Sequence, residues 1–202
     1  MADEHEHDHQ HGHEHAHGEV LDDETRERDA EAEARRRLAL AQIRQYPDPA
    51  LRLTANEIGE FDDDLRRLAD RMVSLMHDAQ GVGLAATQVG ILRRLFVFVP
   101  DDDGARAVVN PRIVERADET ASEEEGCLSL QGVRVPVERV TRLTLEGKDP
   151  NGEDVRWELE GLGARVVQHE LDHLDGVLII DRTDDASRKQ ALAVLRPQPI
   201  LR

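Results

Sequence analysis

The chain has 202 residues, of which 39% are hydrophobic and 34% are charged, and its formal net charge is -17. This length suits one domain with a sizeable core, and the negative charge disfavours binding to nucleic acids, so no specific DNA partner is expected. No apolar run approaches the roughly 20 residues of a membrane span, and the acidic start lacks the pattern of a secretory signal. We therefore expect a cytoplasmic protein without a membrane partner.

Residues 1–20 are predicted to be a disordered, His-rich acidic tail. The stretch "MADEHEHDHQHGHEHAHG" holds seven of the ten histidines and has no apolar periodicity. It is either a loose binder of zinc, nickel or iron or a plain solvated tail. Residues 21–39 predict an N-terminal helical extension, because the segment is acidic early and basic late. Pro47 and Pro49 are expected to end that helix.

Residues 40–196 are predicted to form the globular domain, and residues 197–202 a short tail. The segment "LRRLADRMVSLMHDAQ" has the periodicity of a helix with an apolar core stripe; the stripe consists of Leu65, Leu68, Met72, Leu75 and Met76. Strands are expected within residues 93–100, 105–115, 132–147 and 153–160, with Asn151-Gly152 as a two-residue hairpin turn. The last strong helix should begin near Gly163 and stop at Gly176. This order predicts an α+β fold with antiparallel sheets packed around a C-terminal helix.

The stretch "QHELDHLDG", residues 168–176, lies on that helix. His169 and His173 are four residues apart, so both rings can point at one metal ion, and Glu170 is placed to act as a base. The leucines Leu171, Leu174 and Leu178 should anchor the other side in the core. The pattern is short, however, and a surface helix with incidental histidines is an equal alternative.

A catalytic metal site usually has three protein ligands, so a third is needed. No glutamate follows Glu170, and Ile179 stands where a third histidine would follow in an extended motif. The only cysteine, Cys127 in "EEEGCLSL", is favoured moderately over a buried role for that thiol. The remaining, weaker candidates are Asp175, Asp181, Asp184 and Asp185.

The glycine-rich stretch "GVGLAATQVG", residues 81–90, follows a helix and not a strand, which argues against a dinucleotide-binding loop. It is either a plain turn or a loop whose backbone approaches a substrate, with Gln88 as an amide donor.

Together, "GVGLAATQ", "EGCLSL" and "QHELDH" resemble the three signature motifs of the peptide deformylase family, in the same order and with compatible spacings. The resemblance extends from roughly Leu40 to Arg196 and makes residues 40–196 the catalytic domain. It implies a hydrolase that removes the formyl group from N-formyl-methionyl nascent peptides and releases formate. The implied metal ligands are Cys127, His169 and His173. The implied catalytic groups are Glu170 as general acid and base, with Gln88 and the backbone N–H of Leu128 as oxyanion donors.

The resemblance also implies the ion and the substrate pocket. One ferrous ion per chain is expected, although one thiolate and two imidazoles also suit zinc, and nickel can replace iron. Apolar pocket walls are expected from Val82, Leu128 and Val166, backbone contacts from Gly83, and a carbonyl contact from Arg134. Asp172 is either a carboxylate that supports a metal ligand or a simple exposed group.

Two residues depart from the family pattern: Gln131 stands where proline is usual, and Glu123 is charged where an apolar residue is expected near the pocket rim. Both bear on substrate preference. The C-terminal segment is basic through Arg188, Lys189, Arg196 and Arg202. That charge either contacts the ribosome near its exit tunnel or favours a helix end.

Overall fold

A computed structural model describes residues 23–100 and 104–196. The helices are α1 (Asp23–Leu40), α2 (Asp63–Asp78), α3 (Gly161–Leu174) and α4 (Asp185–Leu195), with short 3-10 helices η1 (Pro49–Arg52), η2 (Ala86–Val89) and η3 (Ile179–Asp181). The strands are β1 (Gly83–Ala85), β2 (Leu95–Phe98), β3 (Arg106–Arg116), β4 (Thr120–Gly126), β5 (Arg134–Val140), β6 (Arg142–Lys148) and β7 (Asp154–Glu160). The predictions for residues 1–20 and for residues 197–202 lie outside the described residues.

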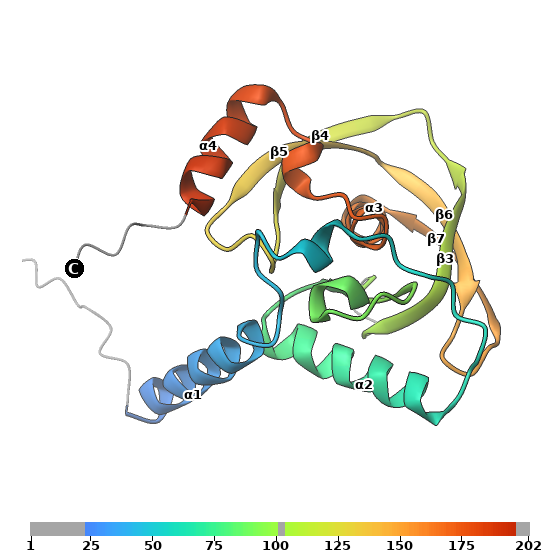
Figure 1. The fold of residues 1–202 in the computed structure, drawn as a ribbon, viewed down its shortest axis with the longest axis horizontal. Helices are drawn as coiled ribbons and strands as arrows, with labels where there is room; N and C mark the ends of the chain where they lie inside the picture. Colours follow the sequence, from blue (N-terminus) through green and yellow to red (C-terminus); the bar gives the residue numbers. More distant parts are fainter. Residues whose placement is uncertain (1–22, 101–103, 197–202) are drawn as a thin grey trace, which may run out of the picture.

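The strands form two antiparallel sheets around α3. One has five strands in the order β1-β2-β3-β6-β7, and the other pairs β4 with β5. Figure 1 looks almost along α3, which lies in the middle of the domain, with α2 below it and the β4–β5 ribbon above it. The predicted α+β class with antiparallel sheets around the motif helix is confirmed. A further helix, α4, follows the motif helix and packs on β5.

Strand β2 is buried on both faces and packs against α3 in the core. Phe96 and Phe98 pack in one cluster with Val167 of α3, on one face of the sheet. Leu95 and Val97 point the other way, into the cluster that contains α2. This alternation follows from the period of two along a strand, so the sheet is a middle layer between the two helices.

Helix α2 confirms the predicted apolar stripe. Leu65, Met72 and Met76 are almost fully buried, and Leu68 is partly buried against the same cluster. The helix begins where the Asp62 side chain accepts a hydrogen bond of 2.9 Å from the Leu65 N–H. This capping satisfies one of the amides that have no partner within the helix.

The hairpin between β6 and β7 is correct in position, but the two-residue turn is wrong. The N–H of Asp149 donates to the carbonyl of Glu153 at 2.8 Å, so the loop contains the three residues 150–152. Gly152 has a φ of +90° and its N–H donates to the Asp149 carbonyl. Glycine therefore adopts the left-handed conformation that closes a three-residue hairpin loop.

Strand β4 was not predicted from the sequence. Its segment "TASEEEG" carries three consecutive glutamates and has no apolar alternation, and only Glu125 in it is buried. The strand forms because all seven of its residues pair with β5, from Thr120–Val140 to Gly126–Arg134. Pairing with a neighbour, which a local pattern does not report, decides its structure.

Helix α1 ends at Leu40, so Pro47 and Pro49 do not end it as expected. Its last residues, Ala39 and Leu40, are buried in the cluster that contains α2. The helix therefore joins the domain at its C-terminal end (Figure 1). Among the described residues, no helix is both long enough and apolar enough to cross a membrane.

Candidate active site and metal centre

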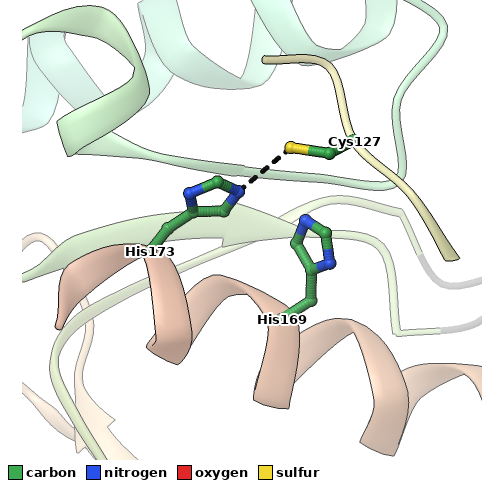
Figure 2. A group of neighbouring side chains, drawn as sticks. All are labelled: Cys127, His169 and His173. Atoms are coloured by element: carbon green, nitrogen blue, oxygen red, sulfur yellow. Dashed lines mark hydrogen bonds between the residues drawn. The ribbon is translucent and has the colours of Figure 1, made fainter. Parts of the chain in front are cut away.

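Helix α3 and the segment after β4 bring the three sulfur and nitrogen ligand candidates together (Figure 2). The rings of His169 and His173 lie on one face of α3 with their centroids 4.9 Å apart. Cys127 Sγ lies 3.2 Å from His173 Nε2, although these residues are 46 positions apart in the sequence. The ligand atoms of all three residues lie within 4.8 Å of one another. One small cation can therefore contact all three side chains.

The four aspartate candidates lie elsewhere. Asp175 pairs with Arg94 at 2.7 Å, and Asp181 pairs with Arg52. The Asp184 side chain caps α4, and Asp185 is exposed in the first turn of that helix. Among the described residues, the structure thus brings the cysteine, and none of these aspartates, to the two imidazoles.

The donor set fits a divalent transition metal. A thiolate and two imidazoles are soft to borderline ligands, which suit zinc, iron or nickel. Glu170 supports the fit: the side chain is buried, and its Oε2 has no hydrogen-bond partner among the described residues. A buried carboxylate oxygen without a partner costs free energy. The free Oε2 beside the cluster is therefore suited to bind a water molecule or substrate.

Burial and neighbours set the proton affinities at this centre. Burial raises the pKa of Glu170 to about 7, and the nearby Glu125 charge adds to the rise. Burial, reinforced by the charges of His169 and Arg139, holds the pKa of His173 well below its usual range. Glu170 can therefore both accept and donate a proton near neutral pH, as a general acid and base must.

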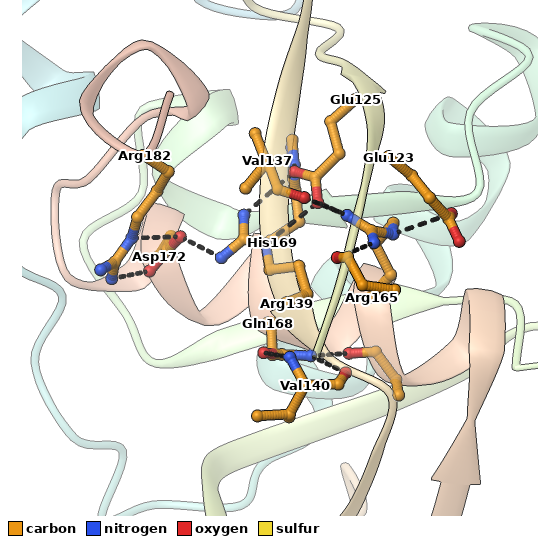
Figure 3. Close-up of polar contacts among 12 residues, drawn as sticks. Glu123, Glu125, Val137, Arg139, Val140, Arg165, Gln168, His169, Asp172 and Arg182 are labelled. Carbon is orange, nitrogen blue, oxygen red and sulfur yellow. Dashed lines mark hydrogen bonds and ion pairs between the residues drawn. The ribbon is translucent and has the colours of Figure 1, made fainter. Parts of the chain in front are cut away.

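A buried ionic network holds His169 in place from behind (Figure 3). Glu125 Oε2 lies 3.1 Å from His169 Nδ1, which leaves the other ring nitrogen available to the cation. Arg139 donates to both oxygens of Glu125 at 3.0 Å, and Arg165 Nη1 donates to Oε1 at 2.9 Å. Although burial opposes it, hydrogen bonds from His169 and Arg139 lower the pKa of Glu125 to about 2. The ionised carboxylate thus fixes the orientation of the imidazole.

Asp172 belongs to the same network and is not an exposed carboxylate. Arg139 Nη1 donates to Asp172 Oδ2 at 2.6 Å, and Arg182 donates to both oxygens of Asp172. Asp172 therefore acts on His169 only through Arg139 and Glu125. The exposed alternative for Asp172 is wrong, because the side chain is almost fully buried.

The sequence reasoning missed Glu125, Arg139 and Arg165. One signal was present: along "RVPVERV", Val135, Val137 and Arg139 occupy alternate positions that face the core. A charged residue in the buried register of a strand requires a buried partner of opposite charge. The run "EEE" conceals that partner, because Glu123 and Glu124 before it are exposed whereas Glu125 itself is buried.

Gln88 joins the glycine-rich stretch to the cysteine. Its Oε1 accepts a hydrogen bond of 2.8 Å from the N–H of Ala85. This bond identifies Oε1 as the acceptor end of the amide and Nε2 as the donor end. Its Nε2 then donates to Ser129 Oγ at 3.1 Å and lies 3.8 Å from Cys127 Sγ. The neighbouring Thr87 Oγ1 donates to the His173 carbonyl at 3.1 Å. The stretch 81–90 is therefore no plain turn, since it places an N–H donor at the centre.

These groups open into one cleft of about 730 Å³. Its wall contains the predicted pocket residues Val82, Gly83, Leu128, Arg134 and Val166, together with Gln88, Cys127, His169 and Glu170. Val166 is buried, Leu128 is partly buried, and Val82 and Arg134 are exposed at the rim.

The two departures from the family pattern lie at different places. Gln131 is exposed and lines the cleft. Glu123 is an exposed partner of Arg165, with 3.1 Å between Glu123 Oε2 and Arg165 Nε. Glu123 therefore borders the ionic network behind the cleft.

Gly83 brings the backbone of β1 against the Glu170 carboxylate. A Cβ added at this position would lie 2.2 Å from Glu170 Oε1 and 2.9 Å from Val166 Cγ1. Gly83→Ala should therefore displace the carboxylate and lower kcat by about 100-fold, the usual effect of a misplacement of about 1 Å. Gly59→Ala is the control, because a Cβ there meets nothing within 4 Å. Equal kcat for the two variants would contradict this geometry.

An α+β fold that gathers a buried carboxylate, an oriented amide and a Cys/His cluster in one cleft is that of a hydrolase with a candidate metal centre. Residues 40–189 match the model of the polypeptide deformylase family. The chain belongs to this family.

Known relatives agree with this assignment. The chain is 46% identical over 156 residues to a peptide deformylase of Alkalilimnicola ehrlichii, covering 76% of this chain and 87% of the relative. It is 48% identical over 147 residues to that of Thermotoga maritima, covering 73% and 89%. The crystal structure of a peptide deformylase from Legionella pneumophila matches with a TM-score of 0.72 and 37% identity, covering 76% of this chain and 91% of that chain.

Proposed function

We propose that this hydrolase removes the formyl group from the N-terminal formyl-methionine of newly synthesised proteins in the cytoplasm and releases formate. The observation that carries the proposal is the approach of Cys127, His169 and His173 within 4.8 Å, beside the buried Glu170. The test is formate release from a formyl-Met peptide by protein purified without oxygen. New amino termini from an unformylated peptide would instead indicate a peptidase.

The ligands of the ion in this proposal are Cys127, His169 and His173, and the ion is one Fe(2+) per chain, with zinc or nickel as substitutes. A cation held there supplies Lewis-acid chemistry, since it lowers the pKa of water and polarises a carbonyl. Chelation should abolish formate release, and adding back Fe(2+), Zn(2+) or Ni(2+) separately identifies the ion that restores it.

Glu170 acts as general base and then as general acid in this proposal. The carboxylate accepts a proton from water as the water oxygen attacks the formyl carbon, and it then donates that proton to the departing amine nitrogen. Burial and the raised pKa support both steps, because a group with a pKa of about 7 exchanges a proton readily at neutral pH. The products are formate and a free amino terminus.

Gln88 and the backbone N–H of Leu128 are the proposed donors to the oxygen that becomes negative during attack. Gln88 is oriented for this role by Ala85 and Ser129. Val82, Leu128 and Val166 are the proposed walls for the methionine side chain. Gly83 and Arg134 are the proposed contacts of the peptide backbone, which would lie beside β1, the edge strand of the larger sheet.

Gln88→Ala should lower kcat by about 100- to 1000-fold, the usual effect of removing one oxyanion donor. Gln88→Glu should be impaired too, because a carboxylate of the same shape accepts hydrogen bonds but has no N–H to donate. The measurements are kcat on a formyl-Met peptide and metal content per chain. Retention of the parent kcat by Gln88→Glu would exclude the proposed donor role.

We also propose a contact with the ribosome near its exit tunnel. Arg188, Lys189 and Arg196 are exposed on and after α4, in a chain of net charge -17. Such a cationic strip favours binding to RNA phosphates. Co-sedimentation with ribosomes that weakens with added salt would support the contact, and no co-sedimentation at low salt would argue against it.

A further inference from the structure

Helix α1 contributes a charged side chain to the catalytic cleft. Arg36 and Leu40 line the same cleft as Cys127, His169 and Glu170. Arg36 precedes residues 40–189, the part of the chain that matches the family model. Arg36 therefore lies outside the family match, whereas Leu40 is its first residue.

The position of Arg36 is fixed by the helix turn that follows it. Residues 36 and 40 are four apart, so they lie on one face of α1. Leu40 is buried in the core cluster with α2, which holds this face against the domain. The neighbouring Arg35 and Arg37 are exposed, whereas the Arg36 side chain is 38% exposed. Arg36 thus lies at the rim with its stem covered and its guanidinium within reach of the cleft.

The Arg36 guanidinium is available to a ligand, because Glu124 and Glu125 of the cleft wall pair with other arginines. Glu125 is neutralised by Arg139 and Arg165, and Glu124 lies 3.8 Å from Arg134. Arg36 Nη1 lies 3.8 Å from Glu33 Oε2, an exposed carboxylate outside the cleft wall.

One further observation points to a ligand for Arg36. Its Nε is buried and has no hydrogen-bond partner among the described residues. A screened surface pair such as that with Glu33 holds its partner weakly.

We propose that Arg36 is a specificity-determining residue, which binds a carboxylate in the peptide residues that follow formyl-methionine. The proposal rests on the proposed deformylation. A peptide extended beside β1 advances about 3.3 Å per residue, so the second to fourth residues leave the reacting centre toward the rim. An arginine fork matches a carboxylate with two parallel hydrogen bonds. Substrates with glutamate or aspartate at these positions are therefore preferred.

The preference is expected to be modest, because the pair forms at a partly exposed site. We expect kcat/KM for a glutamate peptide to exceed that for the matching glutamine peptide by about two- to fivefold. Added salt should reduce the ratio, since ions screen exposed charges. The difference should lie in KM, because a contact far from the reacting bond is equally strong before and during reaction.

The experiment uses three sets of formyl-Met peptides with amidated C-termini, which differ only in Glu, Gln or Lys at residues two to four. Matching peptides with free C-termini test whether the terminal carboxylate binds in the same way. Arg36→Gln should remove the preference for glutamate, and Arg36→Glu should reverse it in favour of lysine. Arg37→Gln is the matched control: it removes the same charge from an exposed position of the same helix that does not line the cleft.

The outcomes separate the two proposals. If the parent protein releases no formate from any peptide, the proposed function fails. If it releases formate but treats the Glu, Gln and Lys peptides alike, the role of Arg36 is excluded. The role is also excluded if Arg37→Gln changes the preference as much as Arg36→Gln. Circular dichroism spectra of all variants show whether α1 and the domain remain folded.

Discussion

Glu170→Gln should lower kcat on a formyl-Met peptide by about 100- to 10 000-fold, the range for loss of a positioned general acid and base. The amide has the size of the carboxylate and fits the same buried space, but it neither takes a proton from water nor gives one to the amine. Because Glu170 is not among the three clustered ligands, the metal content should be unchanged. Formate release and metal per chain are the measurements.

This variant also discriminates between an enzyme and a protein that only stores metal. Storage needs the ligands but no base, so a storage protein would show no functional change on Glu170→Gln. Cys127→Ala provides the complementary result, since it should lower both metal content and turnover. Loss of metal from Glu170→Gln itself would show that the carboxylate is a ligand.

Glu125→Gln should be the most destabilising conservative change in the domain, by about 3–5 kcal/mol, because it removes one charge from a buried network and leaves the others. Arg139, Arg165 and His169 all direct N–H groups at the Glu125 carboxylate. An amide would place its own N–H groups against some of these donors. Metal affinity should fall by about 10- to 100-fold as His169 loses its support.

The neighbouring Glu124→Gln is the matched control for stability. Glu124 is on the same strand, but its side chain is exposed and lies 3.8 Å from Arg134. Its loss should change the free energy of unfolding by less than about 1 kcal/mol. Urea unfolding of both variants gives the comparison. Similar unfolding midpoints for the two would mean that the network contributes little to stability.

The sequence predicted those elements whose local pattern agrees with their packing. Helix α2 has an apolar stripe, α3 has a motif and a glycine stop at Gly176, and the β6–β7 hairpin has Asn151-Gly152. The stripe reports which side of α2 is buried, and the other two signals mark where α3 ends and where the chain turns. Strand β4 was missed, and α1 ends at Leu40 and not at the prolines, because pairing with β5 and packing on α2 decide these features.

The cluster of Cys127, His169 and His173 was predicted, whereas the residues that hold His169 in place were missed. Local spacing brings His169 and His173 to one face of a helix, whereas Cys127 was assigned firmly only through the family resemblance. Contacts between distant segments, such as Cys127 with His173, follow from the fold and not from spacing. The network of Glu125, Arg139 and Arg165 consists entirely of such contacts, so its only local sign is indirect: an arginine in the buried register of β5.

The candidate ligand Cys127 is far from His169 and His173 in the sequence, so the concentration of free ion affects the stability of the fold. Cys127 and the two histidines adjoin only when β4, η2 and α3 are assembled, so an ion bound at all three side chains binds the native chain and not the unfolded one. By mass action, each tenfold rise in free ion above its dissociation constant adds about 1.4 kcal/mol in favour of the native chain. If an ion is bound at these three side chains, the fraction of the chain that is native rises with the free concentration of that ion.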